Sequence, residues 1–98
     1  MVTDMTALER LSRAVADPSR PERLSPCALP VRFAVVRARK DNRGAVRVGD
    51  SSVGRSDPGL APGRALGLRG APAVDLAEVF VLADFSGDGV EASYGGCA

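Results

Sequence analysis

The amino-acid sequence predicts a mainly β fold, a small antiparallel β-sandwich or barrel preceded by a short N-terminal helix and a proline-rich arm. From Val31 onward, short apolar runs are bounded by Gly, Asp, Asn, Ser and Pro, which is typical of strands joined by turns. Before Val31, apolar residues first follow a helical period and then give way to four prolines. With 98 residues, the chain has room for one core and therefore for one β domain.

The N-terminal segment has the pattern of a helix start. Thr6 and Glu9 are spaced as a capping box, in which each side chain bonds a backbone N–H of the first turn. Apolar residues then recur along one helical face at Met5, Leu8, Leu11 and Val15. The pattern ends at Asp17, because Pro18 excludes the residue before it from helical angles. A helix of about three turns is not stable alone, so it needs a surface to pack on.

Residues 17–30 are predicted to be extended, because they contain Pro18, Pro21, Pro26 and Pro30 with charged residues between them. The expected organisation is a helix and arm over residues 1–30 and a β-sandwich domain over residues 31–98. Two arrangements remain open. The arm reaches across to a neighbouring molecule, or the helix folds back over its own sandwich and buries Leu8, Leu11 and Val15 there.

Five strands are expected in the β domain. They cover residues 31–38, residues 45–49, the Leu66 and Leu68 region, residues 76–83, and a last strand with Val90, Ala92 and Tyr94. The turns between them carry Asn and Gly, which tolerate the backbone angles of tight turns.

No residue pattern in the sequence indicates catalysis. The chain has no His, so the commonest general base is missing, and we expect no enzyme activity. Residues 84–89 match the opening of a calcium-binding loop, but the final ligand position is Gly95 where a Glu is required. A hairpin turn explains the same residues, so no metal or other cofactor is expected. Cys27 and Cys97 lack the spacing of a metal or redox pair, and whether they pair with each other is left open.

The charges are balanced in number but not in position. Thirteen Lys and Arg oppose twelve Asp and Glu; all the bases lie at or before Arg69, whereas residues 70–98 carry five acids. The two parts either neutralise each other within one fold or meet between neighbouring subunits.

Basic residues concentrate in the first predicted hairpin, at Arg32, Arg37, Arg39, Lys40, Arg43 and Arg47. The low net charge and the near absence of interleaved aromatics favour a solvated face or a protein contact over nucleic acid. The candidate partner-contact residues are Leu8, Leu11, Val15, Arg32, Arg37, Arg39 and Arg47. The chain has only three Phe and one Tyr, so its own core is expected to be marginal and to be supplemented by association with identical subunits. The first residues lack the apolar h-region of a signal peptide and no run of about 18 apolar residues occurs, so we expect a soluble protein made in the cytoplasm without a membrane partner.

Five short motifs follow one another between residues 40 and 94. These are Asp-Asn-Arg-Gly at 41–44, Val-Arg-Val-Gly at 46–49, Leu-Ala-Pro-Gly at 60–63, Val-Asp-Leu at 74–76 and Gly-Asp-Gly-Val at 87–90. In their order they resemble a small β domain that recurs among tailed-phage virion proteins, including capsid decoration and related head proteins. The resemblance covers a little over half of the chain and brings no catalytic residues with it.

The resemblance implies a structural virion protein on the capsid surface. Its expected function is that of a decoration or cement protein that binds the phage head as an oligomer, as a homotrimer by family analogy, and stabilises joints between subunits of the major capsid protein. The alternatives are a connector, tail or fibre-base component, and a host β-module that binds a peptide or carbohydrate. Copy number in purified particles separates the first two, because a lattice needs far more copies than a vertex or a tail does.

Overall fold

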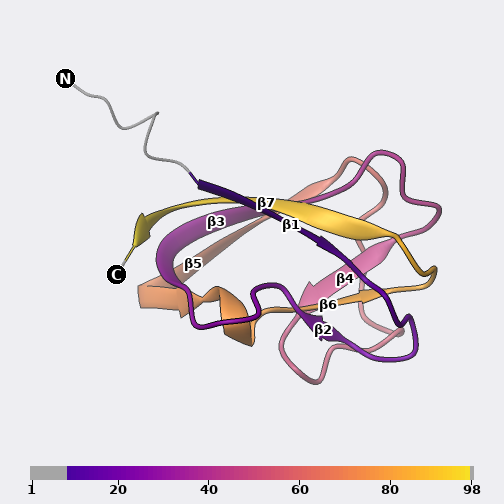
Figure 1. Cartoon of the computed structure of the whole chain (residues 1–98), viewed down its shortest axis with the longest axis horizontal. Coiled ribbons are helices and arrows are strands. Elements are labelled where there is room, and N and C mark those ends of the chain that lie inside the picture. Colours follow the sequence, from indigo (N-terminus) through magenta and orange to yellow (C-terminus); the bar gives the residue numbers. More distant parts are fainter. Residues whose placement is uncertain (1–8, 98) are drawn as a thin grey trace.

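The chain folds into two antiparallel β-sheets packed face to face (Figure 1). The structure is a computed structural model that describes residues 9–97, with side chains 71, 72, 96 and 97 left undescribed. Along the chain the elements are β1 (Glu9–Ala14), β2 (Glu22–Arg23), β3 (Pro30–Ala38), β4 (Val46–Gly49), β5 (Ala65–Asp75), the 3-10 helix η2 (Leu76–Glu78), β6 (Phe80–Ala83) and β7 (Gly89–Cys97). The predicted mainly β, antiparallel fold is confirmed.

Successive strands alternate between the two sheets. The larger sheet has the order β1-β7-β3-β5, and the smaller has the order β2-β6-β4. On the free side of β4, Val46 and Leu60 form a single bridge, with N–H to O distances of 3.0 and 2.6 Å. This is the connectivity of a jelly roll in which the strand after β4 is reduced to one residue pair.

The core lies between the sheets and is built mainly from Val and Ala. Along β3 from Phe33 onward and along β7 from Val90 to Ser93, alternate side chains point inward, whereas in β6 the successive residues Val81, Leu82 and Ala83 are all buried. The inward residues of these strands include Ala34, Val36, Ala38, Val81, Ala83, Val90 and Ala92. No aromatic side chain belongs to the fully buried set among the described residues, and Tyr94 packs only at the margin.

The predicted N-terminal helix is wrong over the described residues, because residues 9–14 form strand β1. This strand pairs with β7, with Leu11 opposite Ala92 and Arg13 opposite Val90. The segment has period two as well as the helical spacing: Leu11, Arg13 and Val15 are the more buried residues and alternate with exposed neighbours. Pairing with β7 gives the segment a ladder of backbone hydrogen bonds to a strand that is already in place, whereas an isolated helix of about three turns is only marginally stable. Met5, Thr6 and Leu8 lie outside the described residues.

Residues 9–30 are part of the sandwich rather than a separate arm. The prolines restrict regular pairing to the two residues of β2, which lie opposite Val81 and Phe80 of β6. The next residue, Leu24, donates its N–H to the Val79 carbonyl at 2.8 Å and buries its side chain in the same core cluster as Val15. No domain boundary therefore falls at residue 30.

The strands predicted from residue 31 onward are found with small differences at their ends. One predicted strand, 76–83, is interrupted, because residues 76–78 form η2 and only Phe80–Ala83 is β6. Asp75 causes the interruption. Its carboxylate accepts hydrogen bonds from Ala77 N and from Leu29 N, both at 2.9 Å, so it caps the helix and fixes the entry to β3.

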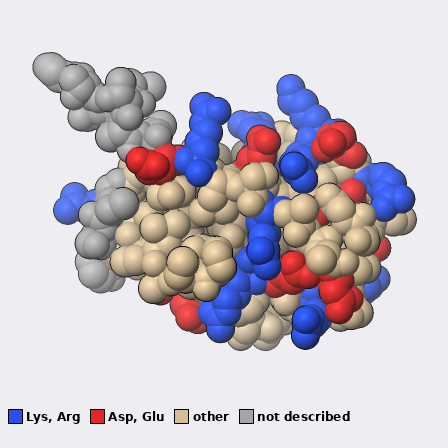
Figure 2. All heavy atoms as spheres, viewed as in Figure 1, with Lys and Arg blue, Asp and Glu red and all other residues tan. Residues whose placement is uncertain are grey.

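Acidic and basic side chains lie next to one another on the face shown in Figure 2. Three ion pairs join bases before residue 70 to acids after it: Arg47 to Asp84 at 3.2 Å, Arg55 to Asp84 at 3.5 Å and Arg23 to Glu78 at 3.4 Å. The two oppositely charged parts of the sequence are thus neighbours within one fold. In the part of the chain that the structure describes, no helix is long and apolar enough to cross a membrane.

Candidate contact surface

The two aspartates of the calcium-like loop bind protein groups. Both carboxylate oxygens of Asp88, which is buried, accept hydrogen bonds from Arg43 N at 3.0 and 2.9 Å, and one also accepts from Gly44 N at 3.0 Å. Asp84 forms the ion pairs with Arg47 and Arg55. Between the aspartates, Gly87 has a φ of 95°, as a tight turn requires. The segment is a hairpin turn whose carboxylates are engaged with the loop after β3 and with two arginines.

Asn42 completes this attachment between two turns. Its amide nitrogen donates to the carbonyl of Gly89, and its amide oxygen accepts from Gly89 N, both at 2.9 Å. Both hydrogen bonds are buried, and each supplies a partner to a polar atom whose burial without one would destabilise the fold. The residues that first suggested ligand chemistry hold the β3–β4 connection against the β6–β7 turn.

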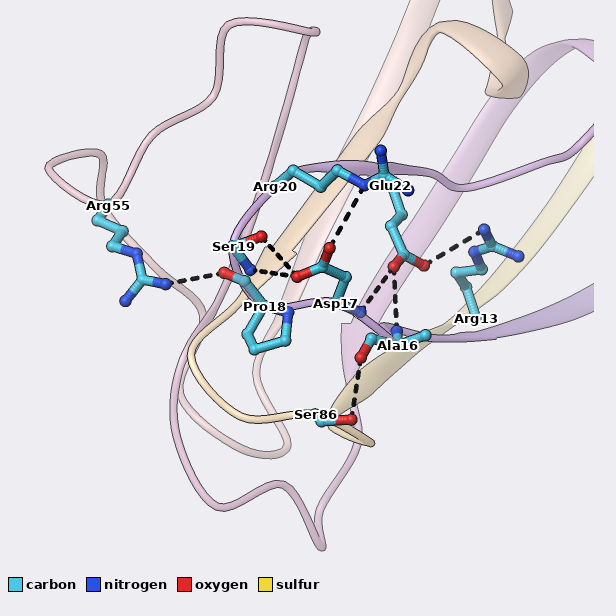
Figure 3. Close-up of polar contacts among 9 residues, drawn as sticks. All are labelled: Arg13, Ala16, Asp17, Pro18, Ser19, Arg20, Glu22, Arg55 and Ser86. Carbon is cyan, nitrogen blue, oxygen red and sulfur yellow. Dashed lines mark hydrogen bonds and ion pairs between the residues drawn. The ribbon is translucent and has the colours of Figure 1, made fainter.

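A second polar cluster fastens the proline-containing loop between β1 and β2 (Figure 3). Glu22 accepts from the backbone N–H groups of Ala16 and Asp17 at 3.1 and 2.9 Å, and pairs with Arg13 at 3.4 Å. Two further contacts tie the loop to distant segments, from Arg55 to the Pro18 carbonyl and from Ser86 to the Ala16 carbonyl. The polar side chains of this cluster bond backbone atoms of the loop, so we assign them a structural role.

The candidate functional surface is the face of the four-stranded sheet that points away from the core, here called the outer face. At its centre, β3 presents Phe33, Val35 and Arg37, because alternate residues of this strand point away from the core. Phe33 is 37% exposed and Val35 is 41% exposed, although β3 lies between two other strands. The alternation breaks at Arg32 and Phe33, which are both exposed where the register with β5 shifts.

Phe33 and Val35 form a ridge along the centre of the outer face, and small residues lie on both sides of Val35 and on one side of Phe33. Val35 lies between Ser93 of β7 and Gly67 of β5, and Phe33 has Gly95 of β7 beside it. A hollow of about 440 Å³ therefore opens beside the ridge, lined by Arg10, Leu11, Ser12, Val35, Arg37, Glu91, Ala92 and Ser93. A second hollow of about 340 Å³ adjoins it and is lined by Arg37, Ala38, Arg39, Lys40, Asp41 and Glu91.

The rim of the outer face is basic. Arg10 on β1, Arg37 on β3 and Arg69 on β5 fall at outward register positions. Glu91 is the acid among them, opposite Arg37 and Ser12. None of the three arginines forms an ion pair with another described residue, and Arg37 donates to the Gly63 carbonyl at 2.8 Å. The surface thus combines an apolar centre with unpaired positive charge.

The structure separates the candidate contact residues predicted from the sequence. Arg32 and Arg37 are exposed and Arg39 is partly exposed, along β3 and just after it. Arg47 lies on β4 of the smaller sheet, where it forms an ion pair with Asp84 and donates a hydrogen bond to the Asp57 carbonyl. Val15 is fully buried and Leu11 packs against the core, so these two are not free for a partner; Leu8 lies outside the described residues.

Sequence reasoning missed the two apolar residues of the outer face and the arginines of the neighbouring strands. The spacing of Phe33, Val35 and Arg37 was the available signal. It was hidden because Val31, Ala34 and Val36 place apolar residues on the other parity as well. Cys27 is exposed and free, and the side chain of Cys97 is not described.

No protein-family model, curated protein sequence or solved structure matches this chain. The outer face and the chemistry of its residues are therefore the features that indicate a function.

Proposed function

We propose that this protein is a non-enzymatic structural module that docks onto another protein through the outer face of its larger sheet. The observation that carries the proposal is the exposure of Phe33 and Val35 in a central strand, with Arg10, Arg37 and Arg69 around them. An antiparallel sheet with one wet face usually alternates apolar and polar residues. Here the middle of the wet face is apolar, which is the arrangement of a contact surface with a dry centre and a polar rim.

The charge of the rim indicates the chemistry of the partner. Three arginines without ion pairs surround one acid, Glu91, so the complementary surface carries carboxylates and an apolar group that fits beside Phe33 and Val35. Arginine also forms bidentate bonds to carboxylates, which fixes the orientation of the partner. We therefore propose an acidic protein surface as the binding site.

Within this class we propose a virion role, supported by the resemblance of residues 40–94 to phage head domains. The protein would act as a capsid decoration or cement protein, with the major capsid protein as the acidic partner. A connector, tail or fibre-base position is the alternative. The jelly-roll connectivity itself does not choose between them, because one fold serves many functions.

The test uses purified particles of a tailed phage whose genome encodes this chain. Quantitative mass spectrometry of the particles is expected to find the protein in hundreds of copies, as a decoration lattice requires. A dozen copies or fewer would favour the connector or tail position. Its absence from the particles would contradict the virion role.

Binding to particles that lack the protein then tests the outer face. The double variant Phe33→Ser and Val35→Ser is expected to lose at least about tenfold in affinity, because central apolar residues of an interface often contribute more than about 1 kcal/mol each. Phe85→Ser is the matched control, since Phe85 is 42% exposed but lies on the β6–β7 turn, where it stacks under Arg43. Equal affinity of the double variant and the native protein would exclude the outer face as the docking surface.

A further inference from the structure

The edge of the larger sheet at β5 is open over residues 65–69. β5 pairs with β3 on one side and has no strand on the other among the described residues. Ala65, Leu66, Gly67 and Arg69 are exposed along it. Beyond Arg69 the edge changes, because a Cβ on Gly70 would overlap the backbone of Ala73, so the chain folds closely onto itself there. The accessible, regular part of the edge is thus five residues long.

The backbone groups directed to this edge belong to Ala65, Gly67 and Arg69. Ala38 bonds toward the β5 side, donating to the Arg64 carbonyl at 2.8 Å, whereas Arg39 bonds toward β7 through the Gly89 carbonyl at 3.1 Å. In antiparallel sheets, alternate residues of a strand bond to opposite neighbours. Leu66 and Leu68, which lie opposite Val36 and Ala34, therefore bond to β3. Their odd-numbered neighbours are left with N–H and C=O groups pointing to the open side.

We propose that two copies of this chain pair through β5, antiparallel and about a two-fold axis at Gly67. The segment Ala-Leu-Gly-Leu-Arg at 65–69 is nearly symmetric about that glycine, and a two-fold contact needs a surface complementary to itself. In this register Gly67 faces Gly67 of the second copy, and each exchanges an N–H to O bond with the other. Ala65 pairs in the same way with Arg69 of the second copy at both ends. The two sheets then become one continuous sheet.

The side chains fit this register as well as the backbone does. Leu66, which is 36% exposed, comes opposite Leu68 of the second copy at a non-hydrogen-bonded pair, the closer of the two pair types. Arg69 comes opposite Ala65, so no like charges oppose each other across the contact. A Cβ built on Gly67 would meet nothing within 4 Å in the single chain, so this stretch of the edge is uncovered, and two glycines at the axis let the backbones approach without a clash.

The opposite edge of the same sheet does not offer this contact. On β1, Arg13 takes an inward position opposite Val90 and pairs with Glu22, and inward charge is one of the features that keep edge strands from pairing. Arg10 and Glu9 add exposed charge along that strand. Residues 65–68 of β5 carry no charge at all. The contact is therefore specific to one edge, and it closes as a dimer rather than as a filament.

The test measures the molar mass of the whole chain by sedimentation equilibrium at about 0.1 mM, where contacts of micromolar strength are populated. The native protein is expected to be a dimer. Gly67→Lys and Gly67→Glu should each be monomeric, because each puts like charges opposite one another at the axis. A Cβ at this position enters open space in the single chain, so both variants should fold with a cooperative melt, and their melting temperatures should match that of the native protein at dilutions where the native dimer dissociates. Ser51→Lys, a charge added in the exposed β4–β5 loop, is the matched control and should remain a dimer.

Mixing the two charged variants gives the most direct test of the contact. An equimolar mixture of Gly67→Lys and Gly67→Glu is expected to recover a dimer with one copy of each, because the introduced ammonium group then faces the introduced carboxylate across the axis. A native monomer at this concentration would overturn the proposal, as would a trimer, which a two-fold contact cannot form. Dimers of the single variants, or a mixture that stays monomeric, would also overturn it.

Discussion

At the scale of single residues, Gly89 is where two parts of the fold approach most closely. Its N–H and C=O are both bonded to Asn42, and the same carbonyl accepts from Arg39 N. A Cβ at this position would overlap the carbonyl of Arg13 on β1. The residue therefore joins β1, β7 and the loop after β3 through backbone contact, and only glycine leaves room for it.

Gly89→Ala is expected to destabilise the protein by about 1–3 kcal/mol, the usual cost of overpacking, because β1 must move away from β7. Gly54→Ala is the matched control, since a Cβ there meets only the Ser52 carbonyl oxygen, at 4.0 Å. Replacing this loop glycine should leave the control equally stable or more stable by about 0.4–1 kcal/mol. Urea unfolding measures both variants. Equal stabilities of the two variants would show that β1 does not pack against Gly89 as described.

The residues of the outer face show how far sequence reasoning reaches at this scale. The sequence predicts Arg32 and Arg37 as contact candidates because charges in a strand seek the solvent side, and both are exposed. It does not predict Phe33 and Val35. The run from Val31 to Val36 has apolar residues on both parities, so the buried side is decided by the bulge at Arg32 and Phe33 and by the neighbouring strands.

At the scale of elements, the strands bounded by turn residues are predictable from the sequence and the N-terminal element is not. Gly44, Gly63 and Gly87 mark chain reversals that local chemistry alone dictates. The segment 9–15 is different, because its apolar spacing fits both a helix and a strand. The segment forms a strand because it pairs with the edge of β7, which lies about eighty residues away in the sequence and is not revealed by any local pattern.

Because β1 and β2 belong to the sandwich, a chain that starts near Leu29 is expected to aggregate or to melt without cooperativity. The truncation removes the buried side chains of Val15 and Leu24 and leaves β7 with one partner strand. Circular dichroism melts and light scattering measure the outcome. A truncated chain with a cooperative melt close to that of the full chain would contradict the integration of residues 9–30.

Leu24→Ala provides the control for that truncation in the full-length chain. It should keep a cooperative transition while losing about 2–5 kcal/mol, the usual cost of a buried leucine. Val35→Ala, on the outer face, should cost much less, because this side chain is largely exposed.

At the scale of the whole molecule, three aspartates make the stability of the fold depend on pH. The pKa of Asp75 lies below its ordinary value of 3.8, because the carboxylate accepts hydrogen bonds from the backbone N–H groups of Leu29 and Ala77. The pKa values of Asp17 and Asp50 are lowered by hydrogen bonds from Ser19 and Ser52. A carboxyl group whose pKa is lower in the folded chain stabilises the fold above the unfolded pKa. That contribution is lost as the pH falls through the folded pKa.

The melting temperature is therefore expected to be steady near neutral pH and to fall as the pH drops below about 4, in the range where these carboxylates take up protons. Asp75→Ala should lower the melting temperature at neutral pH, and its difference from the native protein should shrink as the pH falls through the folded pKa of Asp75, where the native carboxyl group takes up its proton as well. Asp50→Ala is the matched control. Among the described residues, its carboxylate bonds Ser52, two residues away, whereas Asp75 joins segments that are distant in the chain, so the Asp50 variant should follow the native profile more closely. Calorimetric melts over this pH range make the comparison. If Asp75→Ala differs from the native protein by the same amount at both ends of the range, the hydrogen bonds to the Asp75 carboxylate do not couple the fold to acid.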